Sequence, residues 1–205
     1  MSSDEIIAEI VKDEVFYKSS GGGVTFSGGE PLMYGAFCLE VLAKLDGVHC
    51  TTAMETCGYG STEVFRKLAG KLDLIFFDVK HFDPETHRKL TGASNELILN
   101  NLREIQKNAN RIIIRTPVIP GMNDDRENIA YTASLCTELD AVSEWELLPF
   151  HNLGEGKYDS IGKKYDKSLF SKPEAEHMEE LAALANRIME PAGKYCKVEN
   201  SGMAK

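Results

Sequence analysis

Apolar residues along this chain follow two spacings that alternate from one end to the other. Ile6, Ile7 and Ile10 recur at helical spacing behind Ser2 and Glu5, whose separation is that of a helix capping box. Further helical stripes are predicted at residues 37–45, 64–72, 99–105, 129–136 and 178–188, the last opened by Pro173. Continuous or β-branched apolar runs predict strands at residues 24–26, 48–54, 74–77, 112–114 (stopped by Pro117, Pro120 and Gly121) and 145–148. This regular alternation predicts parallel strands and an α/β architecture.

The chain shows no internal repeat, low-complexity stretch or linker, so residues 1–205 are expected to form a single domain. Of its 205 residues, 42% are apolar and 27% are charged, which is an ordinary globular composition. A polar stretch from Asn152 to Lys172, rich in Gly, Lys and Tyr, is predicted to be a long functional or mobile loop.

The charge balance narrows the choice of partners. Lys and Arg number 23 against 32 Asp and Glu, for a net charge of −9. Binding to nucleic acid or to an anionic membrane needs clustered cations, so neither is expected. No apolar run approaches the roughly 18 residues of a membrane span, and the acidic start is unlike a signal peptide. We expect a cytoplasmic protein.

The five cysteines do not form a recognisable framework. They stand at Cys38, Cys50, Cys57, Cys136 and Cys196, and the nearest pair in sequence is seven residues apart. An odd number without a secretion signal argues against disulfides. Metal knuckles and iron–sulfur motifs need much closer pairs, so the chain is expected to carry neither of its own.

Ionisable residues stand at the end of every predicted strand. In parallel α/β folds, ligands bind at the carboxyl ends of the strands. The residues there are Ser27-Gly28-Gly29-Glu30, Glu55-Thr56, Asp78-Val79-Lys80, Arg115 and His151. This mixture of acids and bases suits a zwitterionic ligand that carries both an ammonium and a carboxylate group, such as an amino acid.

Each residue also has a structural interpretation. Asp78 and Lys80 share one face of their strand and could form an ion pair, or Glu55 could neutralise Lys80. Arg115 could bridge carboxylates inside a barrel, and His151 could be an ordinary loop histidine. Convergence of all five strand ends on one rim favours a functional site.

Three further residues are not expected to be ligands. His81 and His87 are predicted to lie on the surface, on either side of Asp83 and Pro84, which look like an N-cap and first helical residue. Cys57 has no activating neighbour in sequence and is interpreted as a small half-buried residue.

The longer motifs resemble the activating enzymes of glycyl radical enzymes, a branch of the radical SAM superfamily whose best-known member acts on pyruvate formate-lyase. The resemblance rests on the segment from Ser20 to Leu32 (SGGGVTFSGGEPL), and on METCGY, FDVK, RTPVIPG and LLPFHNLG in the same order, and it covers nearly the whole chain. ETCG at Glu55 to Gly58, with KDEVFY from Lys12, is more similar to the branch with a ferredoxin-like insert.

The resemblance implies roles for the residues at the strand ends. Gly28, Gly29 and Glu30 would engage the amino group of S-adenosylmethionine, and Asp78-Val79-Lys80 would lie beside it, with Lys80 and Arg115 facing its carboxylate. His151 would contact the methionine–ribose end. A monovalent-cation site would be lined by Glu55, Thr56 and Asp78 with the carbonyl of Phe76, although Glu55 replaces the Asp of the pyruvate formate-lyase type.

One family feature has no counterpart in these 205 residues. Family members begin with a strand and a Cys-x3-Cys-x2-Cys loop, whose thiolates hold a [4Fe–4S] cluster that delivers an electron to S-adenosylmethionine. The resulting 5′-deoxyadenosyl radical abstracts hydrogen from a glycine of the partner enzyme. The fold implied here is therefore a partial (β/α) barrel of about five parallel strands, without the first of the family's six, and N-terminally truncated relative to the family.

The leading hypothesis is the S-adenosylmethionine-binding core of such an activase, a radical SAM oxidoreductase that is inactive as this chain alone. Its expected partners are a glycyl radical enzyme, docked at residues 81–95 and 152–172, and an electron donor such as flavodoxin or ferredoxin. Two alternatives remain: a cluster-free binding or docking module, and a conventional barrel enzyme that uses Glu55, Asp78 and Lys80 for acid–base chemistry.

Overall fold

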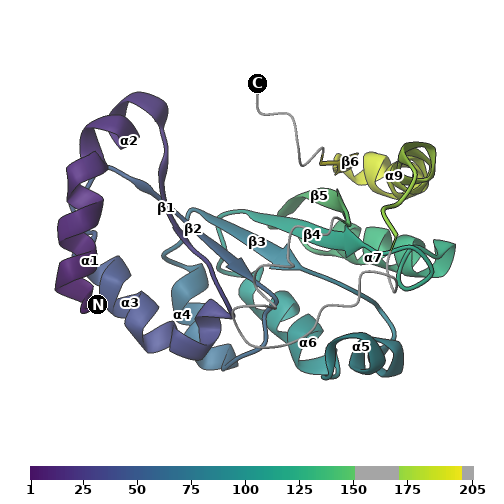
Figure 1. Ribbon diagram of the computed structural model, residues 1–205, viewed down its shortest axis with the longest axis horizontal. Coiled ribbons are helices and arrows are strands. Elements are labelled where there is room, and N and C mark those ends of the chain that lie inside the picture. Colours follow the sequence, from purple (N-terminus) through teal and green to yellow (C-terminus); the bar gives the residue numbers. More distant parts are fainter. Residues whose placement is uncertain (151–170, 200–205) are drawn as a thin grey trace.

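The computed structural model describes residues 1–150 and 171–199, and this part of the chain forms one sheet of six parallel strands. Each strand pairs with the next one in sequence, so the order runs from β1 to β6 without rearrangement. The strands are β1 (Gly23–Phe26), β2 (Thr51–Thr56), β3 (Leu74–Asp78), β4 (Ile112–Val118), β5 (Val142–Pro149) and β6 (Tyr195–Val198). With β1 at one edge and β6 at the other, the described sheet is curved but not closed (Figure 1).

Helices precede β1 and connect the successive strands. They are α1 (Ser3–Ile10), α2 (Glu14–Ser20), α3 (Gly35–Lys44), α4 (Thr62–Ala69), α5 (Pro84–Thr91), α6 (Glu96–Ile105), α7 (Arg126–Glu138) and α9 (Ala175–Met189), with short 3-10 turns at Val11–Asp13, Pro31–Tyr34 and Glu190–Ala192. Their starts follow local chemistry: Ser2 and Glu5 form the predicted capping box, and the Asp83 carboxylate accepts the Thr86 N–H.

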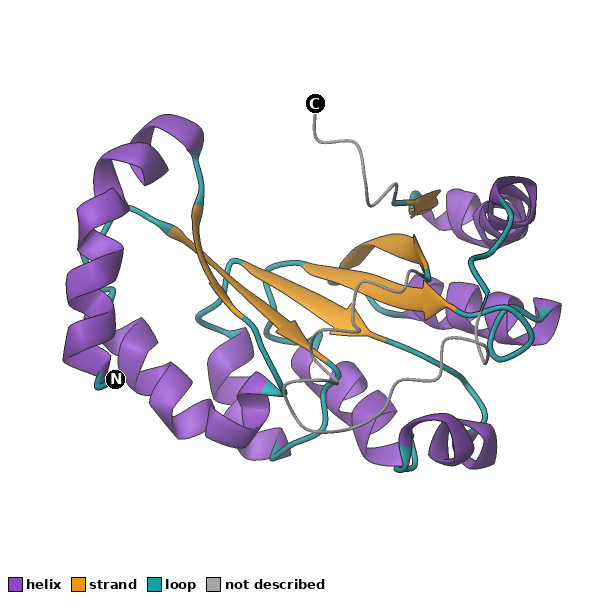
Figure 2. Cartoon of the chain, viewed as in Figure 1, coloured by secondary structure: helices purple, strands orange, loops and turns teal. Residues whose placement is uncertain are grey.

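The core lies between one face of the sheet and these helices. Figure 2 shows α3, α4 and α6 along one side of the strands. Fully buried strand residues such as Phe77, Ile114 and Trp145 join one apolar cluster with Phe65 of α4 and Leu102 of α6. Burial of these side chains contributes the largest share of the stabilisation, at about 1.5–3 kcal/mol for each large apolar group.

The opposite face of the sheet carries charge. Residues paired in register across neighbouring strands include Asp78 with Arg115, Arg115 with Glu146, and Glu146 with Lys197. Because side chains alternate between the faces of a strand, Trp145 and Leu147 enter the core while Glu144 and Glu146 point the other way. This second face is called the open face below.

The α/β architecture with parallel strands is confirmed, with two local differences. β4 extends beyond the predicted residues 112–114 and passes Pro117, ending at Val118 before Pro120 and Gly121. The carbonyl of Arg115 accepts a hydrogen bond from Val79 at the β3 side, and Pro117 faces the same side two residues later. Since β3 has already ended at Asp78, the missing N–H of Pro117 costs no ladder hydrogen bond.

The second difference is the sixth strand, β6, at the C-terminal edge. Its four residues alternate Tyr195, Cys196, Lys197 and Val198, a pattern too short to separate from a loop in the sequence. Its place is set by tertiary contacts: Cys196 is buried in the core, and its N–H and carbonyl are bonded to the Asn186 side chain of α9.

Candidate functional site

The loop after β1 presents bare backbone at the carboxyl edge of the sheet. Gly28 and Gly29 have φ angles of 86° and 57°, in the left-handed region that favours glycine. A Cβ at either position would meet no atom within 4 Å, so open space lies beside both residues. A ligand can therefore approach the peptide groups of this loop closely.

Glu30 anchors that loop to the end of β2. Its Oε1 accepts the hydroxyl of Thr56 at 2.5 Å and the N–H of Leu32 at 3.1 Å, while Oε2 accepts the N–H of Cys57 at 2.8 Å. A carboxylate offers about four acceptor positions, and these three bonds together with that of the Cys57 thiol take nearly all of them. The Glu30 carboxylate therefore has a structural role, because it holds the loop after β1 against the end of β2. Its contact with the amino group of a ligand stays a prediction.

Glu55 connects the first loop to β4. One carboxylate oxygen accepts the Ser27 hydroxyl at 2.6 Å, and the other accepts Nη1 of Arg115 at 2.9 Å. The alternative in which Glu55 neutralises Lys80 is therefore not the arrangement found. Three strand ends that are far apart in sequence meet here.

Arg115 lies at the centre of the open face. Its Nε donates to Oε2 of Glu146 at 2.7 Å, and its guanidinium carbon lies 3.5 Å from the ring centroid of Phe76. The cation thus bridges two carboxylates and stacks on an aromatic ring. This matches the structural interpretation of Arg115, and it also leaves the guanidinium beside the carboxyl edge, where a ligand would bind.

A second group of charged residues lies on the open face, on β5 and β6, and was not identified from the sequence. Glu144 and Glu146 have side chains only 3% and 6% exposed, and Lys197 lies 2.5 Å and 3.2 Å from their Oε1 atoms. Tyr195 donates to Glu144 at 2.6 Å. One sequence signal could have found them. Glu144 and Glu146 alternate with the apolar residues Trp145 and Leu147, which places both glutamates on the same face of the strand.

The charged contacts of Glu144 shift its pKa and those of its partners. Burial works to raise the pKa of Glu144, but hydrogen bonds from Lys197 and Tyr195 outweigh it and leave the pKa lowered. The same hydrogen bonds raise the pKa of Lys197 and of Tyr195. The cluster is therefore most stable with Glu144 ionised and Lys197 protonated.

Asp78 and Lys80 form the expected ion pair at the end of β3. Nζ of Lys80 lies 2.8 Å from Oδ2 of Asp78, and both side chains are about one-third exposed. Val79 between them is buried, and its carbonyl accepts the Thr116 hydroxyl at 2.6 Å. Val79 therefore fixes the segment from inside while its two neighbours face the rim.

The side chains predicted to line a cation site each have partners within the protein. Glu55 lies on the open face with Phe76 and Arg115, whereas the buried hydroxyl of Thr56 turns to Glu30 and accepts the Gly58 N–H. Asp78 is paired with Lys80. The cation site stays a prediction. Since the Thr56 hydroxyl is already bonded to Glu30 and Gly58, the ligands from Thr56 and Phe76 would be backbone carbonyl oxygens.

His151 lies outside the described residues, as does most of the stretch 152–172. The prediction for the other two histidines was wrong in one respect, since His81 and His87 are both buried. His81 stacks on Phe82, and Nδ1 of His87 is 2.7 Å from the Ala93 carbonyl. Burial lowers the pKa of His87, which favours the neutral ring.

Cys57 is half-buried, as predicted. Burial, together with its hydrogen bond to the Glu30 carboxylate, raises the pKa of the thiol to about 11. Within the described residues, no three His, Cys, Asp or Glu side chains lie together as a metal centre would require.

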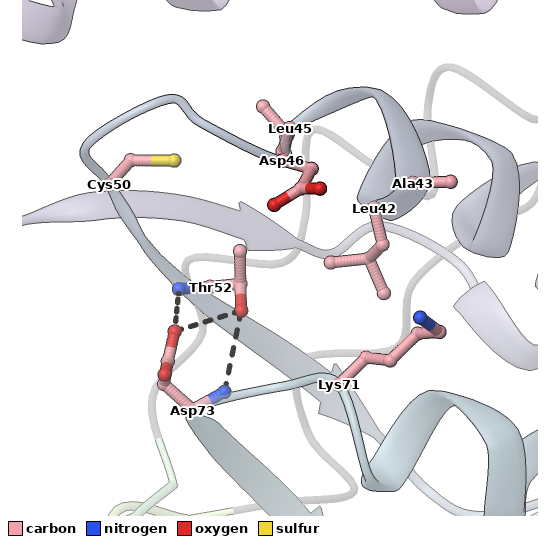
Figure 3. Close-up of a pocket in the computed structure, with 8 residues that line it drawn as sticks. All are labelled: Leu42, Ala43, Leu45, Asp46, Cys50, Thr52, Lys71 and Asp73. Carbon is pink, nitrogen blue, oxygen red and sulfur yellow. Dashed lines mark hydrogen bonds between the residues drawn. The ribbon is translucent and has the colours of Figure 1, made fainter.

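A separate pocket of about 500 Å³ opens at the other end of the sheet, lined by Leu42, Ala43, Leu45, Asp46, Cys50, Thr52, Lys71 and Asp73 (Figure 3). Asp73 accepts both the N–H and the hydroxyl of Thr52, at 2.7 Å and 3.0 Å. These bonds tie the start of β2 to β3. The pocket lies at the amino ends of the strands, away from the residues predicted to bind a ligand.

None of the helices in residues 1–150 and 171–199 combines the length and apolar character needed to cross a membrane.

The sequence pattern of the Radical SAM superfamily matches residues 1–131 of this chain. Over 180 residues the chain is 43% identical to a 4-hydroxyphenylacetate decarboxylase activating enzyme of Clostridioides difficile, covering 87% of this chain and 56% of that protein. A trans-4-hydroxy-L-proline dehydratase activating enzyme from the same species is 40% identical over 187 residues, covering 88% and 60%. The chain thus spans little more than half the length of these relatives.

A solved structure gives the same picture of the fold. The crystal structure of a domain of pyruvate-formate lyase-activating enzyme from Bacteroides vulgatus superposes with a TM-score of 0.70 at 26% identity. The match covers 87% of this chain and 99% of that one.

Proposed function

Because this chain belongs to the radical SAM superfamily, we propose that it is the S-adenosylmethionine-binding core of an enzyme that activates a glycyl radical enzyme. The observation that carries the proposal is the convergence of Gly28-Gly29, the Glu55–Arg115 pair and the Asp78–Lys80 pair on one edge of the sheet. These groups come from four strand ends and combine bare backbone, anions and cations. The 40–43% identity to two activating enzymes supports the same function.

The superfamily implies two groups, S-adenosylmethionine and a [4Fe–4S] cluster, and the residues fit the first. The methionine part of S-adenosylmethionine carries an ammonium and a carboxylate. Open space beside Gly28 and Gly29 leaves carbonyls available to an ammonium group, while Lys80 and Arg115 offer cations to a carboxylate. The neighbouring acids Glu55 and Asp78 hold these two cations in place.

The residues do not fit the cluster. Its family ligands are three cysteines spaced Cys-x3-Cys-x2-Cys, and the five cysteines of this sequence have no such spacing. Cys38, Cys136 and Cys196 are buried in the core. We therefore propose that residues 1–205 act as one domain that binds S-adenosylmethionine, and that the cluster ligands lie outside this sequence.

The role of the chain's own residues is placement. S-adenosylmethionine, when cleaved by reduction, supplies a 5′-deoxyadenosyl radical that abstracts hydrogen from a glycine. Gly28 and Gly29 would orient the amino group, and Lys80 and Arg115 the carboxylate, at the carboxyl edge of the sheet. The Phe76 ring, whose centroid lies 3.5 Å from the guanidinium carbon of Arg115, would help to hold that cation in place.

The proposed partner is a large cytoplasmic glycyl radical enzyme, with flavodoxin or ferredoxin as electron donor. One of these relatives is the activating enzyme of a decarboxylase and the other that of a dehydratase, so they support the class of partner rather than one substrate. In the described part of residues 81–95, α5 presents exposed polar residues near the rim and is the proposed docking element.

A cluster-free binding module is the second candidate. The observation that favours it is the cysteine spacing, since nothing in residues 1–205 can hold the cluster in the family manner. Such a module would bind the same zwitterion without redox chemistry. The acid–base enzyme is less well supported, because Glu55 and Asp78 are each already engaged with a cation.

Titration calorimetry with S-adenosylmethionine tests the proposal. The chain is expected to bind it, and Lys80→Ala is expected to weaken binding at least tenfold because it removes a cation at the rim. Lys89→Ala is the matched control, since Lys89 is an exposed lysine on α5 away from the ion pairs.

The outcomes separate the hypotheses. Absence of binding, both for this chain and for a longer chain that carries the Cys-x3-Cys-x2-Cys segment, would overturn the proposal. Binding to both chains, with hydrogen abstraction by neither, would support the binding module instead.

A further inference from the structure

Arg115 is held by two carboxylates of different character. Glu55 is 45% exposed and bonds to Nη1, whereas Glu146 is 6% exposed and bonds to Nε. An exposed carboxylate can rotate away from its partner and be replaced by water. A buried one cannot do so without leaving a charge unpaired in a medium of low dielectric.

Glu146 is itself fixed from the other side. Its second oxygen, Oε1, lies 3.2 Å from Nζ of Lys197 on β6, and the same Nζ lies 2.5 Å from Glu144. Glu146 therefore sits between two cations on neighbouring strands, with each oxygen committed to one of them. This arrangement leaves its carboxylate a single orientation.

The donors that remain on Arg115 point to a use for this rigidity. A guanidinium carries five N–H donors, and Glu55 and Glu146 take one each. The other three have no hydrogen-bond partner among the described residues. The Arg115 side chain is 21% exposed, so these donors can be reached from the rim.

We propose that Glu146 is a positioning residue: it fixes the guanidinium of Arg115 so that its free N–H groups receive the carboxylate of the ligand. The inference deepens the proposed function and rests on it. Lys197 completes the device by pairing with the second oxygen of Glu146, which is the oxygen that does not face Arg115. Glu144, although it is on the same strand and face and also bonds to Lys197, makes no contact with Arg115 and has no such role.

The test compares Glu146→Gln with Glu144→Gln. Both variants replace a buried glutamate of β5 that contacts Lys197 with a neutral side chain of the same shape. Each is titrated calorimetrically with S-adenosylmethionine and with decarboxylated S-adenosylmethionine, which lacks only the carboxylate. Glu146→Gln is expected to weaken binding of S-adenosylmethionine about tenfold and binding of the decarboxylated compound less than twofold.

Glu144→Gln is expected to change either affinity less than twofold. Equal losses for both compounds in Glu146→Gln would mean that Glu146 only stabilises the fold, and the inference would be overturned. No loss for either compound would overturn it as well.

A second measurement addresses Arg115 without any ligand. The Nε–H resonance of Arg115, assigned by its absence in Arg115→Lys, is expected to exchange slowly with water in the wild type and in Glu144→Gln. It is expected to exchange rapidly in Glu146→Gln, and slow exchange there would overturn the inference. If neither this chain nor the longer chain with the Cys-x3-Cys-x2-Cys segment binds either compound, the proposed function is overturned, while the resonance still decides whether Glu146 fixes Arg115.

Discussion

The two faces of the sheet are built from the same strands but obey opposite rules. On the helix-covered face, Phe77, Ile114 and Trp145 are fully buried among apolar neighbours, and their packing contacts have no preferred direction. On the open face, Arg115 and Glu146 each have specific partners at 2.7–3.2 Å. The helix-covered face stabilises the fold by burying apolar surface, whereas the ion pairs of the open face fix the orientation of charged side chains.

The largest expected effect comes from the helix-covered face. Phe77→Ala removes a fully buried ring that stacks on Phe65 with centroids 6.2 Å apart. It should lower the free energy of unfolding by about 3–5 kcal/mol, because it leaves a cavity. Denaturant unfolding measures the change. Phe16→Ala, at a ring that is 68% exposed, is the control and should change it little.

A backbone variant examines how tightly that face is packed. Gly58 has a φ of 75°, and a Cβ there would lie 2.3 Å from the Phe77 ring. Gly58→Ala should cost about 2–4 kcal/mol, from left-handed strain together with overpacking. Gly47→Ala, at a similar φ of 85° with nothing within 4 Å, carries the strain alone. Equal losses in the two variants would show that the Phe77 contact does not matter.

A pH experiment probes the open face. The lowered pKa of Glu144 means that the folded state binds a proton there less readily than the unfolded chain. Its stabilisation is therefore fully present above the ordinary Glu pKa of about 4.3 and is lost as pH falls through the lower folded value. Unfolding curves below about pH 4.5 should show a shallower loss of stability in Glu144→Gln than in the wild type. At pH 7 this variant should be less stable by about 2 kcal/mol.

The smallest effect is expected on the outer surface of the helices. Lys67 and Glu63 form an i,i+4 pair on α4 at 2.7 Å, with both side chains more than half exposed. Lys67→Gln keeps helix propensity and should leave the melting temperature unchanged, because water and salt screen such pairs. A clear drop would mean that exposed ion pairs matter here as much as those of the open face.

Much of the fold followed from local patterns. The alternation of strands and helices came from apolar spacing, and the helix starts at Ser2 and Asp83 came from capping chemistry within four residues. The positive φ angles of Gly28 and Gly29 are ones that glycine favours by itself. The strand predicted at 48–54 begins instead at Thr51, because pairing with β1 and β3 decides its register.

The site was only partly visible from the sequence. The ionisable residues at the strand ends were identified, and Asp78 with Lys80 formed the pair that their spacing allows. The burial of His81 and His87 was not seen, because it depends on how the loops after β3 pack against Asn95 and the neighbouring helices.

By itself, the sequence determined the periodicities, the caps, the bare glycine loop and the set of charges that reach the carboxyl edge. Only the tertiary structure decided which charges meet. Arg115 finds Glu146 and Glu55 at separations of 31 and 60 residues, and both contacts depend on the register of parallel strands. The reason is physical: local propensity acts within a few residues, whereas the direction of a buried ion pair is set by strands brought together through the whole core.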